Sequence, residues 1–287
     1  MLNNEFINHL TSHIEDKILC QKPISGGDIS SAYYIKTQNQ DYFLKTNSNS
    51  NASNMFIAEK EGLDAIAKTN TIAIPKIYLL GSFKSYSYIL MEYIEAITPN
   101  KNSLEKLGTQ LAKLHQTKTQ KFGFKHDNFI GNLHQSNKYH SNWYTFYIEE
   151  RLLPQIDLAI SKRLLNQNEV PGSNKTQVVL DNLFKNVTPS LLHGDLWSGN
   201  FLIATNGVPY LIDPASYYGH SEVDIAMTKL FGGFDPDFYN AYHNIIPQDE
   251  YSTSRIEIYQ LYYLLVHLNL FGRSYHSSVK HILSKYF

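Results

Sequence analysis

Two stretches of the chain contain side chains that could bind a metal ion and accept a proton. The first, residues 193–200, has the sequence HGDLWSGN and contains Asp195 and Asn200, and the second, residues 211–213, ends in Asp213. Carboxylate and amide oxygens are the ligands that hard cations such as Mg²⁺ prefer, in sites completed by substrate phosphates. A further carboxylate beside such a site can act as a proton acceptor. These residue types therefore suit chemistry on a phosphate-bearing substrate.

A predicted β-hairpin joins the two stretches. Its apolar runs flank Asn206-Gly207, which favours a tight turn because both positions tolerate positive φ. With a two-residue turn, Asn200 pairs with Asp213 across the hairpin. We therefore expect the amide and the carboxylate to lie side by side, with Asp195 in the loop just before them.

The spacing D-x-x-x-x-N followed by a second Asp is typical of phosphoryl transfer in protein kinases, where the first Asp is the base and the other two residues bind Mg²⁺. A lone Asp in a loop is more often a turn residue or a helix cap, so the interpretation depends on the whole set. His-Gly-Asp replaces the kinase His-Arg-Asp, Asp-Pro-Ala replaces Asp-Phe-Gly, and Trp197 replaces a lysine. These departures favour a small-molecule substrate.

A lysine far upstream fits the same scheme. Lys45 follows the apolar residues 42–44 of a predicted strand, where it could reach the α- and β-phosphates of ATP. In that arrangement a glutamate of the next helix holds the lysine. The helix expected over residues 55–67 offers Glu59, which we prefer, and Glu61 as the alternative. The competing interpretation is a lysine that protects an edge strand from aggregation.

Backbone contacts to the nucleotide are expected at two further places. Gly26 and Gly27 lie between β-prone runs, and the amides of such a turn can approach a triphosphate closely. A buried strand then runs into a linker at Glu92, Tyr93 and Ile94, whose backbone would offer a carbonyl and an amide to adenine. The chain lacks the G-x-x-x-x-G-K-[ST] pattern, so a P-loop NTPase is not supported.

These elements predict an α+β fold with two lobes. Residues 1–91 would form a small, β-rich, nucleotide-binding lobe, residues 92–98 a hinge, and residues 99–287 a larger, mainly helical, catalytic and substrate-binding lobe. Asp224 lies in the first turn of a predicted helix of the larger lobe. It could cap that helix or accept backbone N–H groups from the loop of Asp195, and the two roles are compatible.

Composition excludes several other classes of protein. The chain has 287 residues, 43% of them hydrophobic and 18% charged, as in ordinary globular proteins. A net charge of −1 argues against nucleic acid or an anionic membrane as a partner, and no apolar run is long enough to span a bilayer. Cys20 is the only cysteine, which excludes an intrachain disulfide and a thiolate zinc cluster and favours the cytoplasm.

These motifs together resemble the fructosamine kinase (ketosamine-3-kinase) family, which is related to aminoglycoside phosphotransferases and choline kinases within the protein-kinase-like fold. The resemblance covers nearly the whole chain, and its most specific part runs from Asp213-Pro214-Ala215 to the sequence LFGGF at residues 230–234. Further matching segments are residues 25–29, 42–46, 55–63, 122–124, 128–131 and 193–200.

The resemblance implies ATP-dependent phosphorylation of the 3-hydroxyl of a ketosamine, the adduct of a sugar with a protein or a free amine. The phosphorylated adduct is unstable and falls off, so the family acts in deglycation. By the same resemblance, Asp195 accepts the hydroxyl proton, Asn200 and Asp213 bind Mg²⁺, and Lys45 with Glu59 positions ATP.

Two neighbours of Asp195, namely His193 and Trp197, are our candidates for contact with the substrate, and the indole of Trp197 could pack on the sugar. Two alternatives to a ketosamine kinase stay open. One is a kinase for another hydroxylated amine, such as an aminoglycoside or choline. The other is a pseudokinase-like module that binds nucleotide without chemistry, which the joint presence of lysine, base and metal ligands disfavours.

Overall fold

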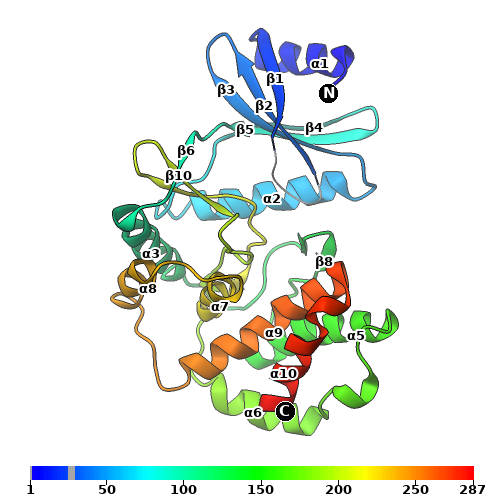
Figure 1. The fold of residues 1–287 in the computed structure, drawn as a ribbon, viewed down its shortest axis with the longest axis vertical. Coiled ribbons are helices and arrows are strands. Elements are labelled where there is room, and N and C mark those ends of the chain that lie inside the picture. Colours follow the sequence, from blue (N-terminus) through cyan, green and yellow to red (C-terminus); the bar gives the residue numbers. More distant parts are fainter. Residues whose placement is uncertain (1, 25–29) are drawn as a thin grey trace.

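The computed structural model describes residues 2–24 and 30–287, with a smaller β-rich part and a larger helical part (Figure 1). The predicted phosphate-binding residues Gly26 and Gly27 lie outside the described residues. The strands are β1 (Ile18–Ile24), β2 (Ser31–Thr37), β3 (Asp41–Asn47), β4 (Ile77–Phe83), β5 (Tyr86–Glu92), β6 (Ala96–Ile97), β7 (Asn128–Ile130), β8 (Leu133–Gln135), β9 (Ser190–Leu191), β10 (Phe201–Ala204), β11 (Pro209–Leu211) and β12 (Tyr218–Gly219). The helices are α1 (Asn4–Ile14), α2 (Ala52–Ala67), α3 (Lys101–His115), α4 (Trp143–Tyr147), α5 (Leu153–Ser161), α6 (Ser173–Leu183), α7 (Glu222–Leu230), α8 (Pro236–His243), α9 (Ser252–Phe271) and α10 (His276–Tyr286), with short turns η1 (Ile148–Leu152), η2 (Gln167–Glu169) and η3 (Arg273–Tyr275).

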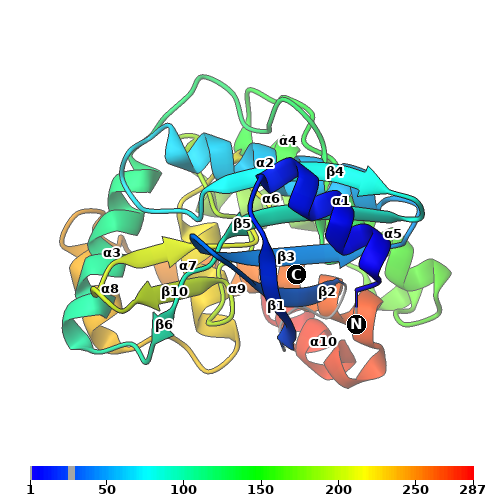
Figure 2. The same cartoon turned by 90° about the horizontal axis from the view of Figure 1, so that it is seen from above.

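The β-rich part is an antiparallel sheet of five strands in the order β1-β2-β3-β5-β4, with a helix on each face. Helix α1 lies across one face (Figure 2), where Phe6 packs in a cluster with Leu44. Helix α2 covers the other face, where Phe56 packs with Ile89. Because side chains alternate along a strand, Leu44 faces α1 and its neighbour Lys45 faces α2. The alternation therefore directs the predicted lysine toward the helix that carries the candidate glutamates.

The helical part is built around α9, which is buried on nearly all sides and belongs to one large apolar cluster. Helices α5, α7 and α10 pack against it (Figure 1). The helix ends where Gly272 adopts φ +89°. This core supports the elements that carry the polar motifs.

A small sheet links the two parts. Strand β6, inside the predicted hinge, pairs with β10, and β10 pairs with β11, so the segment after the main sheet is tied to the hairpin. The predicted α+β architecture with a small β-rich and a larger helical part is confirmed, while the boundaries at residues 91 and 98 stay a prediction. Among the described residues, no helix combines the length and hydropathy needed to cross a membrane.

Candidate active site

The loop that carries Asp195 is anchored by a buried carboxylate. Asp224 in the first turn of α7 accepts the backbone N–H groups of His193 (2.7 Å) and Gly194 (2.8 Å). His115 donates its Nε2–H to the same carboxylate at 3.0 Å. Burial opposes ionisation, but the hydrogen bonds and the His115 ring lower the pKa of Asp224. The prediction that Asp224 fixes the backbone of this loop is therefore confirmed.

The side chain of His193 stabilises the loop through hydrogen bonds to the backbone. Its side chain is fully buried, its Nδ1 accepts the backbone N–H of Asp195 (3.2 Å), and its Nε2 donates to the carbonyl of Ile212 (2.8 Å). The expectation that His193 contacts the substrate is corrected accordingly, because no face of the ring reaches the cavity. The two hydrogen bonds require a neutral ring, and burial lowers the pKa of His193.

The hairpin that follows has a register different from the predicted one. Phe201 pairs with Leu211, and the loop contains three residues, closed by the hydrogen bond from the Ala204 N–H to the Val208 carbonyl (2.9 Å). Gly207, at φ +76°, supplies the left-handed residue that three-residue hairpin loops use. The expected two-residue turn is therefore wrong by one residue.

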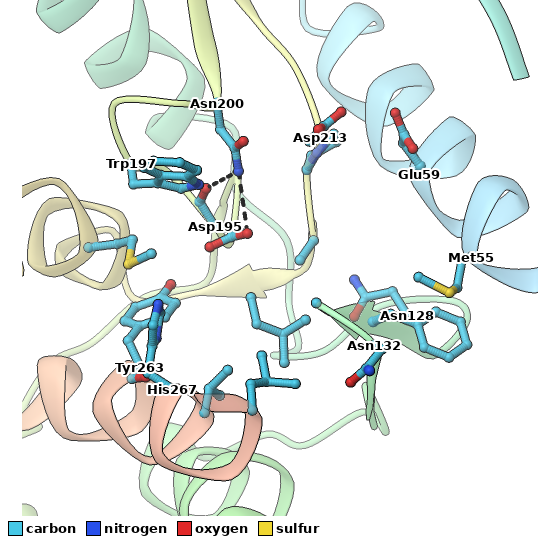
Figure 3. Close-up of a pocket in the computed structure, with 18 of the residues that line it drawn as sticks. Met55, Glu59, Asn128, Asn132, Asp195, Trp197, Asn200, Asp213, Tyr263 and His267 are labelled. Atoms are coloured by element: carbon cyan, nitrogen blue, oxygen red, sulfur yellow. Dashed lines mark hydrogen bonds between the residues drawn. The ribbon is translucent and has the colours of Figure 1, made fainter. Parts of the chain in front are cut away.

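The new register changes the partner of Asn200. Its carbonyl accepts the N–H of Ile212 at 3.1 Å, so the predicted pairing of Asn200 with Asp213 is wrong. A shift by one residue would send the two side chains to opposite faces of a regular strand. Asp213, however, lies beyond the strand at φ +55°, and both side chains line the same cavity (Figure 3).

Asn200 is oriented by Asp195. Its Nδ2 donates to the backbone carbonyl of Asp195 at 2.7 Å and to Oδ2 of its carboxylate at 3.3 Å (Figure 3). Within the described part of the chain, Oδ1 of Asn200 accepts no hydrogen bond, so this amide oxygen is open in the cavity that Asp213 also lines. One amide oxygen and one carboxylate are a donor set that fits Mg²⁺.

Lys45 lies between two carboxylates from different elements. Its Nζ is 2.8 Å from Oε1 of Glu59 on α2 and also contacts Oδ1 of Asp213 after β11. Glu61 instead bonds the His126 ring at 2.9 Å. Of the two glutamates that the sequence left open, Glu59 is therefore the partner of Lys45.

Burial and the balance of charges set the pKa values of these groups. Burial raises the pKa of Glu59 to about 7, whereas Lys45 lowers the pKa of Asp213 against the effect of burial. Burial, together with the charges of Asp213 and Asp224, raises the pKa of Asp195 to about 7. A carboxylate with a raised pKa is a stronger proton acceptor that still ionises near neutral pH.

A cavity of about 640 Å³ brings six of the predicted residues together. Glu92, Tyr93 and Ile94 are not part of its lining, so their contact with adenine stays a prediction. The predicted residues that line the cavity are Lys45, Glu59, Asp195, Trp197, Asn200 and Asp213.

Other lining residues were not assigned from the sequence. Asn128 and Asn132 come from the β7–β8 hairpin, and Tyr263 and His267 come from α9 (Figure 3). The hydroxyl of Tyr263 also donates to the carbonyl of Gly194 at 2.8 Å. Tyr263 and His267 share one face because residues four positions apart do so on a helix, but α9 carries other polar side chains as well, so its sequence does not single out this pair. The hairpin residues carry no signal of their own.

Comparisons with known proteins point to one family. The family model described as "Fructosamine kinase" matches residues 2–287. A "Probable ketoamine kinase" of Enterococcus faecium is 42% identical over 92% of this chain and 94% of its own length. The chloroplastic "Protein-ribulosamine 3-kinase" of Arabidopsis thaliana is 40% identical over 92% of this chain and 81% of its own length.

Solved structures show the same fold. A structure from Haemophilus somnus described as a fructosamine-3-kinase superposes with a TM-score of 0.87 at 28% identity, covering 98% of this chain and 96% of the other. An aminoglycoside phosphotransferase in complex with ADP and hygromycin B has a TM-score of 0.64 at 17% identity over 98% of both chains. The second likeness shows the protein-kinase-like fold alone.

Because the loop backbone packs closely at Gly194, we expect alanine to cost more stability there than at Gly207, which has a similar φ. Gly194 (φ +86°) and Gly207 (φ +76°) are both left-handed, but a Cβ on Gly194 would lie 2.1 Å from the carbonyl oxygen of Ala215, whereas one on Gly207 meets nothing within 4 Å. Gly207→Ala should cost only the backbone strain of about 1–2 kcal/mol. Gly194→Ala should lower the free energy of unfolding by about 1–3 kcal/mol more, measured by urea denaturation. Equal losses would show that this close approach is not a constraint.

The neutral state of His193 predicts a pH-dependent effect. Because the pKa is lower in the folded state than in the unfolded chain, the wild type should lose stability as the pH falls below about 6.5. His193→Gln removes that titration. The variant should be less stable than the wild type by about 1–3 kcal/mol at pH 7.5, and the gap should shrink at pH 5.5. A gap that stays constant or widens in urea titrations would contradict this assignment.

Proposed function

Because this chain belongs to the fructosamine kinase family and is a phosphotransferase that acts on ketosamines, we propose that it transfers the γ-phosphoryl group of ATP to the 3-hydroxyl of a ketosamine. The observation that carries the proposal is the meeting of Lys45, Asp195, Asn200 and Asp213 in one cavity. Phosphoryl transfer depends mainly on positioning and charge stabilisation, which these four side chains can supply.

In this scheme Asp195 is the proton acceptor. Its carboxylate lines the cavity, and Asn200 Nδ2 orients it through a hydrogen bond. As the sugar hydroxyl attacks phosphorus, Asp195 takes its proton, and its raised pKa makes that transfer more favourable. Glu59 holds Lys45, and Lys45 reaches the phosphates.

Asn200 and Asp213 are the residues that would hold Mg²⁺. The ion, when bound, neutralises charge on the phosphate oxygens as the phosphoryl group moves. Asn200 keeps its amide oxygen available because its nitrogen is engaged by Asp195. Asp213 is suited to the same task because its pKa is lowered and its carboxylate stays ionised.

The names of the relatives support the choice of substrate, and the fate of the product is part of the proposal. The Arabidopsis relative is named a protein-ribulosamine 3-kinase, so we propose ribulose- or fructose-derived adducts, protein-bound or free, as substrates. Phosphorylation at the 3-hydroxyl would destabilise the adduct, and its loss would make this chain a deglycation enzyme. Its location in the cytoplasm stays a prediction.

The proposed activity predicts selective phosphate transfer. With labelled ATP and Mg²⁺, ribulosyl-lysine and fructosyl-lysine should be phosphorylated with kcat/KM at least about 100-fold above an aminoglycoside or choline, the range that a site built for one set of hydroxyls can reach. Transfer to the aminoglycoside or choline alone would favour the other kinase class. Nucleotide binding without turnover on any acceptor would favour the pseudokinase alternative.

Asp195→Asn tests the proposed base with little change in shape. The amide cannot accept the hydroxyl proton, so kcat should fall at least about 100-fold, while the Kd of MgATP, measured by calorimetry, should change little. Asp157→Asn, at an exposed position of α5 away from the cavity, is the matched control. Full turnover in Asp195→Asn would refute the assignment.

Trp197→Ala tests the proposed sugar contact. The indole is 41% exposed and lines the cavity beside Asp195, so its loss should raise the KM for the ketosamine about fivefold or more, as expected for about 1 kcal/mol of aromatic contact. The KM for ATP should stay unchanged. A ketosamine KM equal to that of the wild type would place the sugar elsewhere.

A further inference from the structure

The cavity extends past the proposed base to an end that the phosphoryl-transfer residues do not use. In Figure 3, Asp195 lies between Glu59 on one side and Tyr263 and His267 of α9 on the other. If ATP occupies the side of Lys45 and Glu59, the side of α9 is open to the acceptor. The residues at this end therefore face the acceptor molecule.

Four aromatic rings cluster at this end. His267 lies at the centre, with ring centroids 4.6 Å from Phe231, 5.5 Å from Phe271 and 5.2 Å from Tyr275. We call these four residues the ring cluster. Phe231 is 39% exposed and Phe271 is 53% exposed. Large apolar side chains that remain exposed at the mouth of a cavity are typical of a binding surface.

The ring cluster is uncharged. Among the described lining residues contributed by α7, α9 and the segments that follow them, none is Asp, Glu, Lys or Arg. His267 donates its Nδ1–H to the carbonyl of Tyr263 (2.8 Å), and burial lowers its pKa, so the ring stays neutral. Such a surface suits methylene groups and the face-on approach of an ammonium group, and it disfavours a carboxylate or a phosphate.

The chemistry of a ketosamine connects this end to the reaction. The amine nitrogen is bonded to C1, and C1 is two bonds from C3. The nitrogen therefore lies close to the 3-hydroxyl that faces Asp195 in the proposed reaction. The substituent on that nitrogen must leave the reaction centre away from the phosphates. The ring cluster lines the end of the cavity opposite Glu59.

We propose that the ring cluster binds the amine-side substituent of the ketosamine and selects adducts on amines with an extended aliphatic chain, such as the lysine side chain, over adducts on small amines. This inference rests on the proposed function. The protonated secondary amine and the methylene chain are the groups that the rings contact.

The test compares two adducts of the same sugar, one on the ε-amine of Nα-acetyl-lysine amide and one on methylamine. The wild type should prefer the lysine adduct at least tenfold in kcat/KM. Phe231→Ala and Phe271→Ala should each reduce that preference at least fivefold, through a higher KM for the lysine adduct. Tyr251→Ala, a similarly exposed aromatic (40%) just before α9 and outside the cavity, is the matched control and should keep the wild-type preference.

The possible failures are distinguishable. A wild type that phosphorylates both adducts equally well, or variants that keep the full preference, would overturn the role of the ring cluster and leave the ketosamine kinase activity intact. A wild type that phosphorylates neither adduct would overturn the proposed function and this inference with it. The thermal unfolding temperature of each phenylalanine variant is measured as well. If it lies within a few degrees of that of the wild type, a loss of preference is due to weaker binding and not to loss of the fold.

Discussion

A buried cation shared by two carboxylates joins the parts of the molecule on which the site depends. Lys45 comes from the sheet, Glu59 from the helix packed on that sheet, and Asp213 from the end of the hairpin of the helical part. Replacing Lys45 by a neutral residue would leave both carboxylates without their cation, which costs several kcal/mol. The three side chains therefore hold these elements together, and their surplus of negative charge favours a divalent cation.

A second set of contacts fixes the proposed base relative to this cluster. Asp224 and His193 together bind the backbone of residues 193–195, and Tyr263 binds the same loop from α9. All of these partners are buried, so water does not compete for the hydrogen bonds. Positioning within a fraction of an ångström is what this class of reaction requires of a protein.

The sequence was more informative about which residues form the candidate site than about how the backbone positions them. Residue types and spacing were enough to select Asp195, Asn200, Asp213 and Lys45, which line one cavity in the structure, because the chemistry restricts which side chains can serve. The hairpin register was missed because a glycine with positive φ, such as Gly207, serves two- and three-residue loops alike. The substrate role of His193 was wrong because a motif does not reveal which way a side chain points. The contribution of α9 depends on packing between distant segments, which no local pattern encodes.

We propose that the hairpin brings an amide and a carboxylate into one site that holds metal-bound ATP. This arrangement can be measured by calorimetric titration of ATP with and without Mg²⁺, in the wild type and in Asp213→Asn. Mg²⁺ should strengthen ATP binding to the wild type at least about tenfold, equivalent to about 1.4 kcal/mol, and the variant should lose most of this gain. A variant that keeps the full gain would show that Asp213 does not hold the ion.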